Sequence, residues 1–154
     1  MKGSSPVPSI TDVLKSISDD KALTIFNSIA VSRGDRNICL REINLSTKQY
    51  YSRLSGLINA GLIRRDNGKY SLTLIGKIVY DAQLEIGKAL SYYWKLKAIE
   101  SIERSSSSLL DAGLTKEEEL TQLINALIDN HSIKDLLIKE LLSYTLEAPS
   151  TTST

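Results

Sequence analysis

Cysteine, histidine, proline and long apolar runs are all scarce in this chain of 154 residues. With one cysteine, Cys39, and one histidine, His131, a single chain can form neither a disulfide framework nor the common Cys/His type of zinc site. No apolar run approaches the about 18 residues of a membrane helix, and no apolar segment follows Lys2 as in a secretory signal. Three prolines and eight glycines do not suggest a mostly disordered chain. We therefore expect a cytoplasmic globular protein without a membrane segment, a metal or a cofactor.

Patterns typical of catalysis are missing as well. The sequence has no Gly-rich phosphate loop, no nucleophile elbow and no paired-carboxylate pattern. The acidic run Glu117-Glu118-Glu119 falls at the start of a predicted helix, where acids stabilise the helix dipole. We therefore expect no catalytic residues, and we predict that the protein is not an enzyme.

The formal net charge of +1 is distributed unevenly along the chain. Residues 33–77 contain nine basic and three acidic residues, a balance of +6, whereas residues 78–154 contain seven basic and twelve acidic residues, a balance of −5. Such a basic block is typical of a surface that faces a polyanion, although local ion pairs would also account for it.

The first 76 residues are predicted to contain a tail and a small helical domain. Residues 1–17 form a tail with a possible short helix, and residues 18–76 form the domain. Ser18 is the predicted cap of its first helix, a very short helix follows near Leu40, and Ser46 caps an amphipathic helix over residues 46–60. The predicted apolar face of this helix consists of Tyr50, Leu54, Leu57 and Ile58.

A β-hairpin is predicted directly after this helix, over residues 63–72. Asn67-Gly68 is the strongest two-residue hairpin signal, because both central positions of a type I′ turn need a positive φ. Two strand-like runs flank this turn. Ile63, Tyr70 and Leu72 can face inward, and Arg64, Arg65 and Lys69 can project outward near the tip.

The predicted elements follow the order of a winged helix-turn-helix: a helix, a short helix, a capped helix and a basic hairpin. A helix fits the major groove of DNA, where its N-terminal residues reach the base edges. The basic hairpin would meet phosphates or the minor groove. Tyr51 either contacts the DNA backbone or packs beside the helix. The candidate DNA-binding residues are Thr47, Lys48, Gln49, Tyr51, Ser52, Arg53, Arg64, Arg65, Lys69 and Lys77.

Three stretches of this region resemble the archaeal winged helix-turn-helix transcription regulators. They are Lys48-Gln49-Tyr50-Tyr51-Ser52-Arg53-Leu54, Ala60-Gly61-Leu62-Ile63, and Lys69-Tyr70-Ser71-Leu72-Thr73 with Gly76. The resemblance covers roughly residues 18–90. It implies sequence-specific binding of double-stranded DNA, usually by a homodimer, and control of transcription. It also implies that Thr47 to Gln49, Ser52 and Arg53 are recognition positions. The short second helix departs from the longer one of many bacterial relatives.

One long helix over residues 77–104 is predicted to follow the domain. Its heptad-like spacing forms an apolar seam that either packs on the C-terminal helices or meets a second subunit. We expect the dimer. The candidate dimer-interface residues are Val79, Ala82, Ile86, Ala89, Tyr93 and Leu96. Residues 109–147 are predicted to form a helical hairpin, capped by Thr115 with Glu118, and residues 148–154 a disordered tail.

The expected fold is thus mainly α, a winged helix-turn-helix with a small β-hairpin wing, a long helix and a C-terminal helical hairpin. Two other functions are compatible with this order of elements. A winged helix with an acidic C-terminal half also suits a protein–protein interaction module in a transcription-related assembly. A regulator that senses a small molecule would need a pocket between the long helix and the C-terminal hairpin, and no sequence feature names a ligand.

Overall fold

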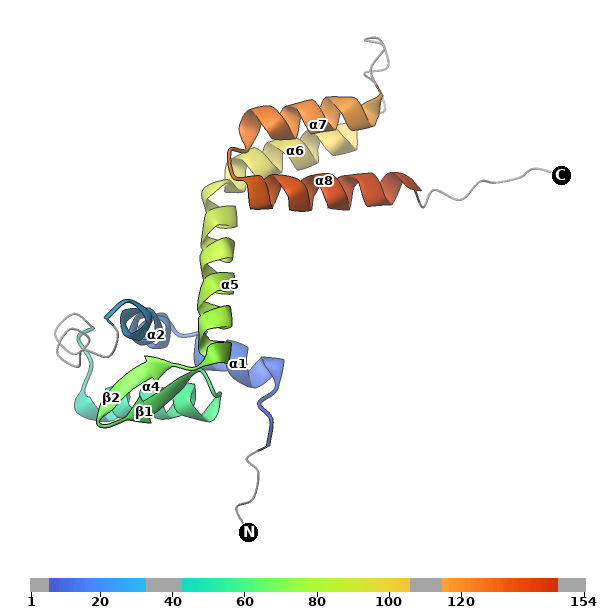
Figure 1. Ribbon diagram of the computed structural model, residues 1–154. Coiled ribbons are helices and arrows are strands. Elements are labelled where there is room, and N and C mark those ends of the chain that lie inside the picture. The colour runs from blue at the N-terminus through green and yellow to red at the C-terminus, as the bar shows by residue number, and fades with distance from the viewer. Residues whose placement is uncertain (1–5, 33–42, 106–114, 147–154) are drawn as a thin grey trace. The chain divides into compact units, whose positions relative to one another are not determined.

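The computed structural model describes residues 6–32, 43–105 and 115–146 and is mainly helical, with one two-stranded antiparallel hairpin among these residues (Figure 1). The chain divides into two compact units, an N-terminal unit of residues 1–85 and a C-terminal unit of residues 86–154. The boundary falls inside helix α5, which runs over Leu74–Ser91. None of the helices in the described part of the chain is long and apolar enough to cross a membrane.

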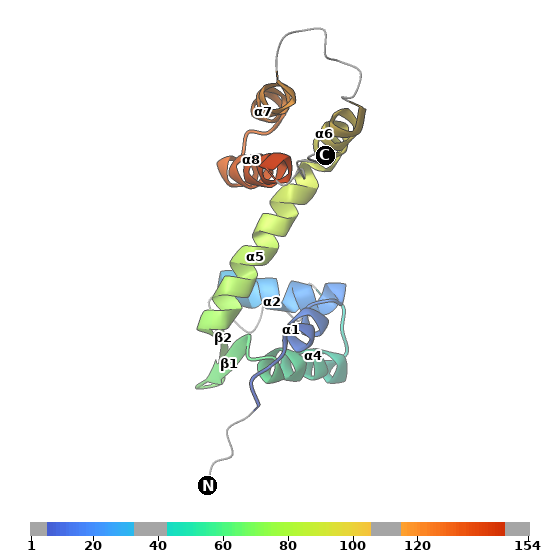
Figure 2. The same cartoon turned by 90° about the vertical axis from the view of Figure 1, so that its right-hand side faces the viewer.

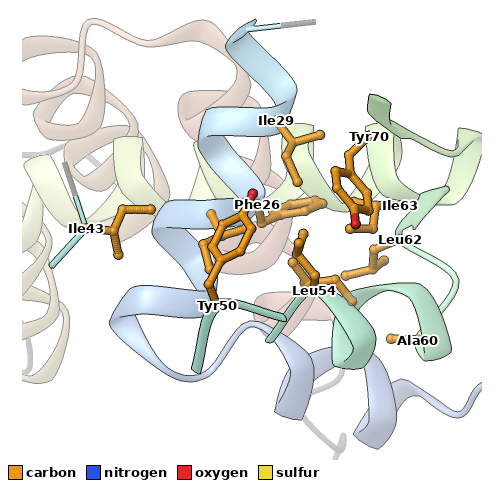
Figure 3. Packing of buried hydrophobic residues seen from close by; sticks show 11 residues of the cluster. Phe26, Ile29, Ile43, Tyr50, Leu54, Ala60, Leu62, Ile63 and Tyr70 are labelled. Carbon is orange, nitrogen blue, oxygen red and sulfur yellow. The ribbon is translucent and has the colours of Figure 1, made fainter. Parts of the chain in front are cut away.

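The N-terminal unit is built around a core between helix α2 (Asp20–Ser32), helix α4 (Thr47–Asn59) and the hairpin of β1 (Ile63–Asp66) and β2 (Lys69–Leu72). Helix α1 (Ile10–Ser16) precedes these elements. In two perpendicular views α4 and the hairpin lie next to one another (Figures 1 and 2). Figure 3 shows side chains from α2, α4 and both strands converging. The buried core residues labelled there include Phe26, Ile29, Tyr50, Leu54, Ile63 and Tyr70.

Both ends of α4 are capped by hydrogen bonds. At its start the Ser46 hydroxyl accepts a hydrogen bond from the Gln49 N–H, and the Gln49 side chain accepts one from the Ser46 N–H, which completes a capping box. At its end Gly61 adopts a φ of +73°, and the N–H groups of Gly61 and Leu62 donate to the carbonyls of Ile58 and Leu57. This is a Schellman motif, in which glycine avoids the strain of the left-handed conformation.

The hairpin has the register and turn that the sequence predicts. Ile63 pairs with Leu72 and Asp66 with Lys69, and the two turn residues Asn67 and Gly68 have φ values of +50° and +78°, as a type I′ turn requires. Ile63 and Tyr70 are buried, Leu72 is partly buried, and the predicted outward cations are exposed.

The start of α5 is attached closely to the segment after α4. The Thr73 hydroxyl donates to the Gly61 carbonyl (2.5 Å) and accepts from the Gly76 N–H (2.9 Å). Gly76 is buried, and a Cβ at this position would collide with the carbonyl of Leu62. Glycine is therefore needed at Gly76 because two segments of backbone pass in contact there.

Several sequence predictions for the N-terminal unit are wrong in detail. Helix α2 begins at Asp20, and the Asp19 carboxylate caps it by accepting from the Lys21 N–H. The hydroxyl of Ser18, the predicted cap, instead donates to the backbone carbonyl of Lys15. Ile58, predicted to be in the core, is 40% exposed because it lies at the edge of the buried face of α4. The predicted short helix near Leu40, and Cys39 itself, lie outside the described residues.

The prediction of one continuous helix over residues 77–104 is also wrong. Helix α5 ends at Ser91, and a separate helix, α6, runs over Tyr93–Ser105. In a regular helix the Tyr92 N–H would donate to the Lys88 carbonyl. Here the Ser91 hydroxyl donates to that carbonyl (2.6 Å), and the Tyr92 N–H donates to the Ala89 carbonyl instead (3.0 Å). Tyr92 also packs against the core of the C-terminal unit, so burial of its ring favours the break.

The C-terminal unit contains α6 together with helices α7 (Lys116–Leu127) and α8 (His131–Leu146), so α6 adds a third helix to the predicted hairpin. Ile99 of α6 packs with Leu120, Ile124 and Ile128 in one buried cluster. The capping box of Thr115 and Glu118 is present, as predicted. Helix α8 begins at His131, and the Asn130 side chain caps it by accepting from the Ile133 N–H. The predicted C-terminal tail lies outside the described residues.

Candidate nucleic-acid interface

One face of α4, called here its free face, carries exposed polar side chains. Tyr50, Leu54 and Leu57 are buried on the opposite side of the helix. The side chains on the free face are exposed and, among the residues that the structure describes, make no hydrogen bond or ion pair. They are Lys48, Ser52, Ser55 and Asn59. This arrangement leaves one ammonium group, two hydroxyls and one amide available to a partner.

The two residues beside Lys48 at the start of α4 are both exposed, but only one side chain is unengaged. The Thr47 side chain has no partner among the described residues, whereas the Gln49 side-chain oxygen accepts the Ser46 N–H at 3.2 Å. Bidentate pairing of glutamine with adenine needs both the oxygen and the nitrogen of the amide. Gln49 would therefore have to leave its capping position to read adenine in that way.

Arg53 is turned away from the free face of α4. Its Nε donates to the Asp19 carboxylate at 2.5 Å, and its Nη1 donates to the Gln49 carbonyl at 3.3 Å. The Arg53 side chain is 26% exposed. The Lys21 N–H and, second, the Arg53 guanidinium hold the pKa of the Asp19 carboxyl below its ordinary value. Sequence reasoning missed this ion pair because its partners are 34 residues apart.

Tyr51 combines packing with exposure. Its ring lies edge-on to the ring of Tyr50, with centroids 5.5 Å apart, and the residue is 46% exposed. Such pairs stabilise both rings. Both alternatives considered for Tyr51 are thus compatible with its position: it packs beside the helix and still presents part of its ring to solvent.

The hairpin carries three exposed cations, with Arg64 and Lys69 on one face and Arg65 on the face of Tyr70, with which it pairs. Arg64 forms a surface ion pair with Asp66 (3.0 Å), and Arg65 lies over the ring of Tyr70, 5.8 Å from its centroid. Lys69 is exposed and has no ion-pair partner among the described residues. Exposed ion pairs are weak and are broken at little cost, so all three cations remain accessible to an anion.

Lys77 and Arg64 both line an open cavity of about 590 Å³. All of its described lining residues belong to the N-terminal unit. It is therefore not the pocket beside the C-terminal helices that a small-molecule sensor would need. Its described lining residues are Ile29, Ala30, Arg64, Ser71, Leu72, Lys77, Tyr80 and Asp81. Lys77, on the first turn of α5, is therefore close to the base of the hairpin.

Comparisons with protein-family models, with curated proteins and with solved structures found no match. Arguments about this surface therefore rest on its own geometry. In the part of the chain that the structure describes, no three His, Cys, Asp or Glu side chains are grouped so that they could hold a metal ion. The chemistry available at this surface is that of three lysines, two accessible arginines, hydroxyls and amides.

The residues of the expected dimer seam have diverse surroundings. Val79 packs partly against the core of the N-terminal unit and Leu96 against that of the C-terminal unit. Ile86 is 62% exposed and Tyr93 46% exposed. Ala82 is exposed, and Ala89 is partly exposed. The two ends of the seam thus pack within the chain, whereas its middle residues are exposed or partly exposed, with the Tyr93 ring edge-on to that of Trp94.

Proposed function

We propose that this protein is a sequence-specific DNA-binding transcriptional regulator that acts without catalysis, and that residues 18–76 form a winged helix-turn-helix. The observation that carries the proposal is the exposed polar face of α4, with Lys48 and Ser52 unengaged, next to a hairpin bearing Arg64, Arg65 and Lys69. The order of elements and the buried side of α4 support it. A helix with this face fits the major groove of duplex DNA.

In this proposal the base-reading residues are those whose side chains are unengaged. Thr47, Lys48 and Ser52 read base edges, and Asn59 joins them toward the end of α4. Lysine pairs with guanine, and asparagine pairs with adenine through its amide. Arg53, a sequence-based candidate for guanine, instead supports the fold through Asp19. Gln49 contributes mainly to the capping of α4.

The hairpin supplies affinity that does not depend on base sequence. Arg64, Arg65 and Lys69 pair with phosphates or enter the minor groove beside α4, and Lys77 adds a further phosphate contact. Phosphate contacts fix the position of a protein on the duplex, whereas base contacts determine its sequence preference. Because each neutralised phosphate releases counterions, this part of the affinity falls as salt is added.

We further propose that the protein binds as a homodimer through the exposed middle of the expected dimer seam. Ala82, Ile86 and Ala89 of α5 and Tyr93 of α6 would meet the same residues of a second copy. The exposed Ile75, Ile78 and Ile86 of α5 support this proposal, since a group of exposed apolar side chains is typical of an interaction site. A two-fold protein matches two half-sites about one turn of DNA apart.

The experiment is a fluorescence-anisotropy titration of a labelled duplex pool of random sequence with three proteins. They are the wild type, Lys69→Ala on the hairpin, and Lys139→Ala in α8 as a control with the same loss of charge. We expect micromolar or tighter binding by the wild type at low salt. Lys69→Ala weakens binding, because one phosphate contact is lost, and Lys139→Ala does not. Absence of wild-type binding, or equal losses in both variants, would contradict the proposal.

A second function, a protein-interaction module, is favoured by one feature of the C-terminal unit. Trp94, the sole tryptophan, is 80% exposed, with its ring edge-on to Tyr93. Tryptophan is enriched in binding hot spots. This function predicts a stable protein partner that Trp94→Ala releases, with no salt-sensitive binding of DNA by the wild type.

A further inference from the structure

Gly56 is placed in the interior of α4 at a cost to the stability of the helix. A glycine inside a helix is less favourable than alanine by about 0.5–1 kcal/mol, because the unfolded chain loses more conformational freedom on folding. Gly56 lies three residues before the end of α4 at Asn59. Neither end of the helix therefore needs it for capping, since Ser46 and Gly61 already serve there.

Three other glycines of the described chain are required by the fold, whereas Gly56 is not. Gly61 and Gly68 have positive φ values, and a Cβ on Gly76 would collide with Leu62. Gly56 has helical backbone, and a Cβ built on it would meet no described atom within 4 Å. Alanine would fit in the folded chain, so packing within the described residues does not explain the glycine.

The position of Gly56 connects it to the free face of α4. Lys48, Ser52 and Gly56 follow at intervals of four residues and so lie in one row along the helix, in which Lys48 and Ser52 are exposed and Gly56 is partly exposed. Asn59 is the neighbour of Gly56 one turn further on. Gly56 is thus a gap in a row of polar side chains, where the helix backbone is partly exposed and a Cβ would meet no described atom within 4 Å.

We propose that Gly56 marks the point at which DNA comes closest to α4, an inference that rests on the proposed DNA-binding function. The missing Cβ lets the sugar–phosphate wall of the groove contact the helix backbone directly, while Lys48 and Ser52 reach deeper on one side and Asn59 on the other. Glycine is the residue that permits such close approach of backbone and ligand. The stability that the helix loses at Gly56 is offset by a closer fit to the duplex.

The test uses Gly56→Ala and Gly56→Gln, with Gly87→Ala and Gly87→Gln as matched controls. Gly87 also lies inside a helix, α5, is exposed, and would place a Cβ within 4 Å of no described atom. The melting temperature and the oligomeric state of each protein are measured. Each protein is then titrated onto the duplex that the wild-type chain selects from a random-sequence pool, at several salt concentrations.

We expect both alanine variants to raise the melting temperature by about 2–8 °C, because glycine is removed from a helix interior. Gly56→Ala weakens DNA binding about tenfold, and Gly56→Gln weakens it further, because added atoms overfill a close contact. The dependence of affinity on salt keeps its slope, because no charge changes. The Gly87 variants bind DNA as the wild type does.

Three results would overturn the inference, and they are distinguishable. If the wild type binds DNA and both Gly56 variants bind it equally well, the close approach is elsewhere, and the proposed function survives. If the wild type binds no duplex, the DNA-binding function and this inference are both wrong. A Gly56→Ala variant that is less stable than the wild type would also contradict the inference, because the glycine would then be needed by the fold itself.

Discussion

Arg53 of α4 donates through its Nε to the carboxylate of Asp19, the residue that caps α2. One carboxylate thus accepts from the Lys21 backbone at the start of α2 and from a guanidinium on α4. The pair connects two helices whose packing forms the core of the N-terminal unit. It also withdraws Arg53 from the free face of α4, although a basic residue at this point of the sequence is expected to contact DNA.

Arg53→Ala is therefore expected to affect folding more than DNA recognition. The variant should unfold at a lower urea concentration than the wild type, because the connection to Asp19 is lost. Lys48→Ala should instead reduce the preference for the selected duplex over random DNA by about 1–3 kcal/mol, as expected for one lost base contact. Urea denaturation and anisotropy titrations measure both effects. If Arg53→Ala weakened binding of the selected duplex by about 1–3 kcal/mol relative to random DNA, Arg53 would be a base-reading residue after all.

The lowered pKa of the Asp19 carboxyl predicts how the contribution of this residue depends on pH. The charged form is favoured in the folded state, so its stabilising effect is present above the pKa of the unfolded chain and is lost as the pH falls through the lower folded value. Asp19→Asn keeps a capping side chain but removes the charge. The wild type should be more stable than Asp19→Asn at pH 7, and the difference should shrink below about pH 4. A difference that grows in acid would contradict this assignment.

Gly76→Ala should destabilise the protein, in contrast to alanine at Gly56. The added Cβ would meet the Leu62 carbonyl, and the start of α5 would have to shift from the segment after α4. The expected loss is about 1–3 kcal/mol in the free energy of unfolding, as for an overpacked core. Urea denaturation of the two variants side by side measures it, and an unchanged or higher stability of Gly76→Ala would show that the close approach is absent.

Ile86→Glu should dissociate the proposed homodimer without unfolding the chain. Ile86 is 62% exposed in the single chain, so a charge there is tolerated by the fold but is buried in the proposed interface. Leu136→Glu is a matched control, because Leu136 is 61% exposed on α8 and lies outside the seam. Sedimentation analysis should give a dimer dissociation constant at least about tenfold higher for Ile86→Glu alone. Equal behaviour of both variants, or a monomeric wild type, would contradict this interface.

Local signals in the sequence predict much of this fold. Four predicted features depend on residues close in sequence, and all are confirmed: the N-cap at Ser46, the capping box at Thr115, the turn at Asn67-Gly68, and the burial of Tyr50, Leu54 and Leu57.

Features that depend on distant residues were not predicted. The break after Ser91 results from a side chain competing for a backbone carbonyl and from burial of Tyr92, which a heptad pattern does not reveal. The engagement of Arg53 required knowing that Asp19 lies beside it. In the candidate site, the sequence therefore predicts which residues lie on α4 and the hairpin, but not which of their side chains are engaged.

The most direct test of the DNA-binding proposal is the salt dependence of duplex binding by the wild type. Four cations are proposed to contact phosphates: Arg64, Arg65, Lys69 and Lys77. If all four neutralise phosphates, the logarithm of affinity falls with the logarithm of salt with a slope of about −3 to −4 per protomer, a loss of roughly 150-fold between about 50 and 200 mM salt. A slope near this value supports the account. Binding that does not change with salt, or no binding at the lower concentration, would contradict it.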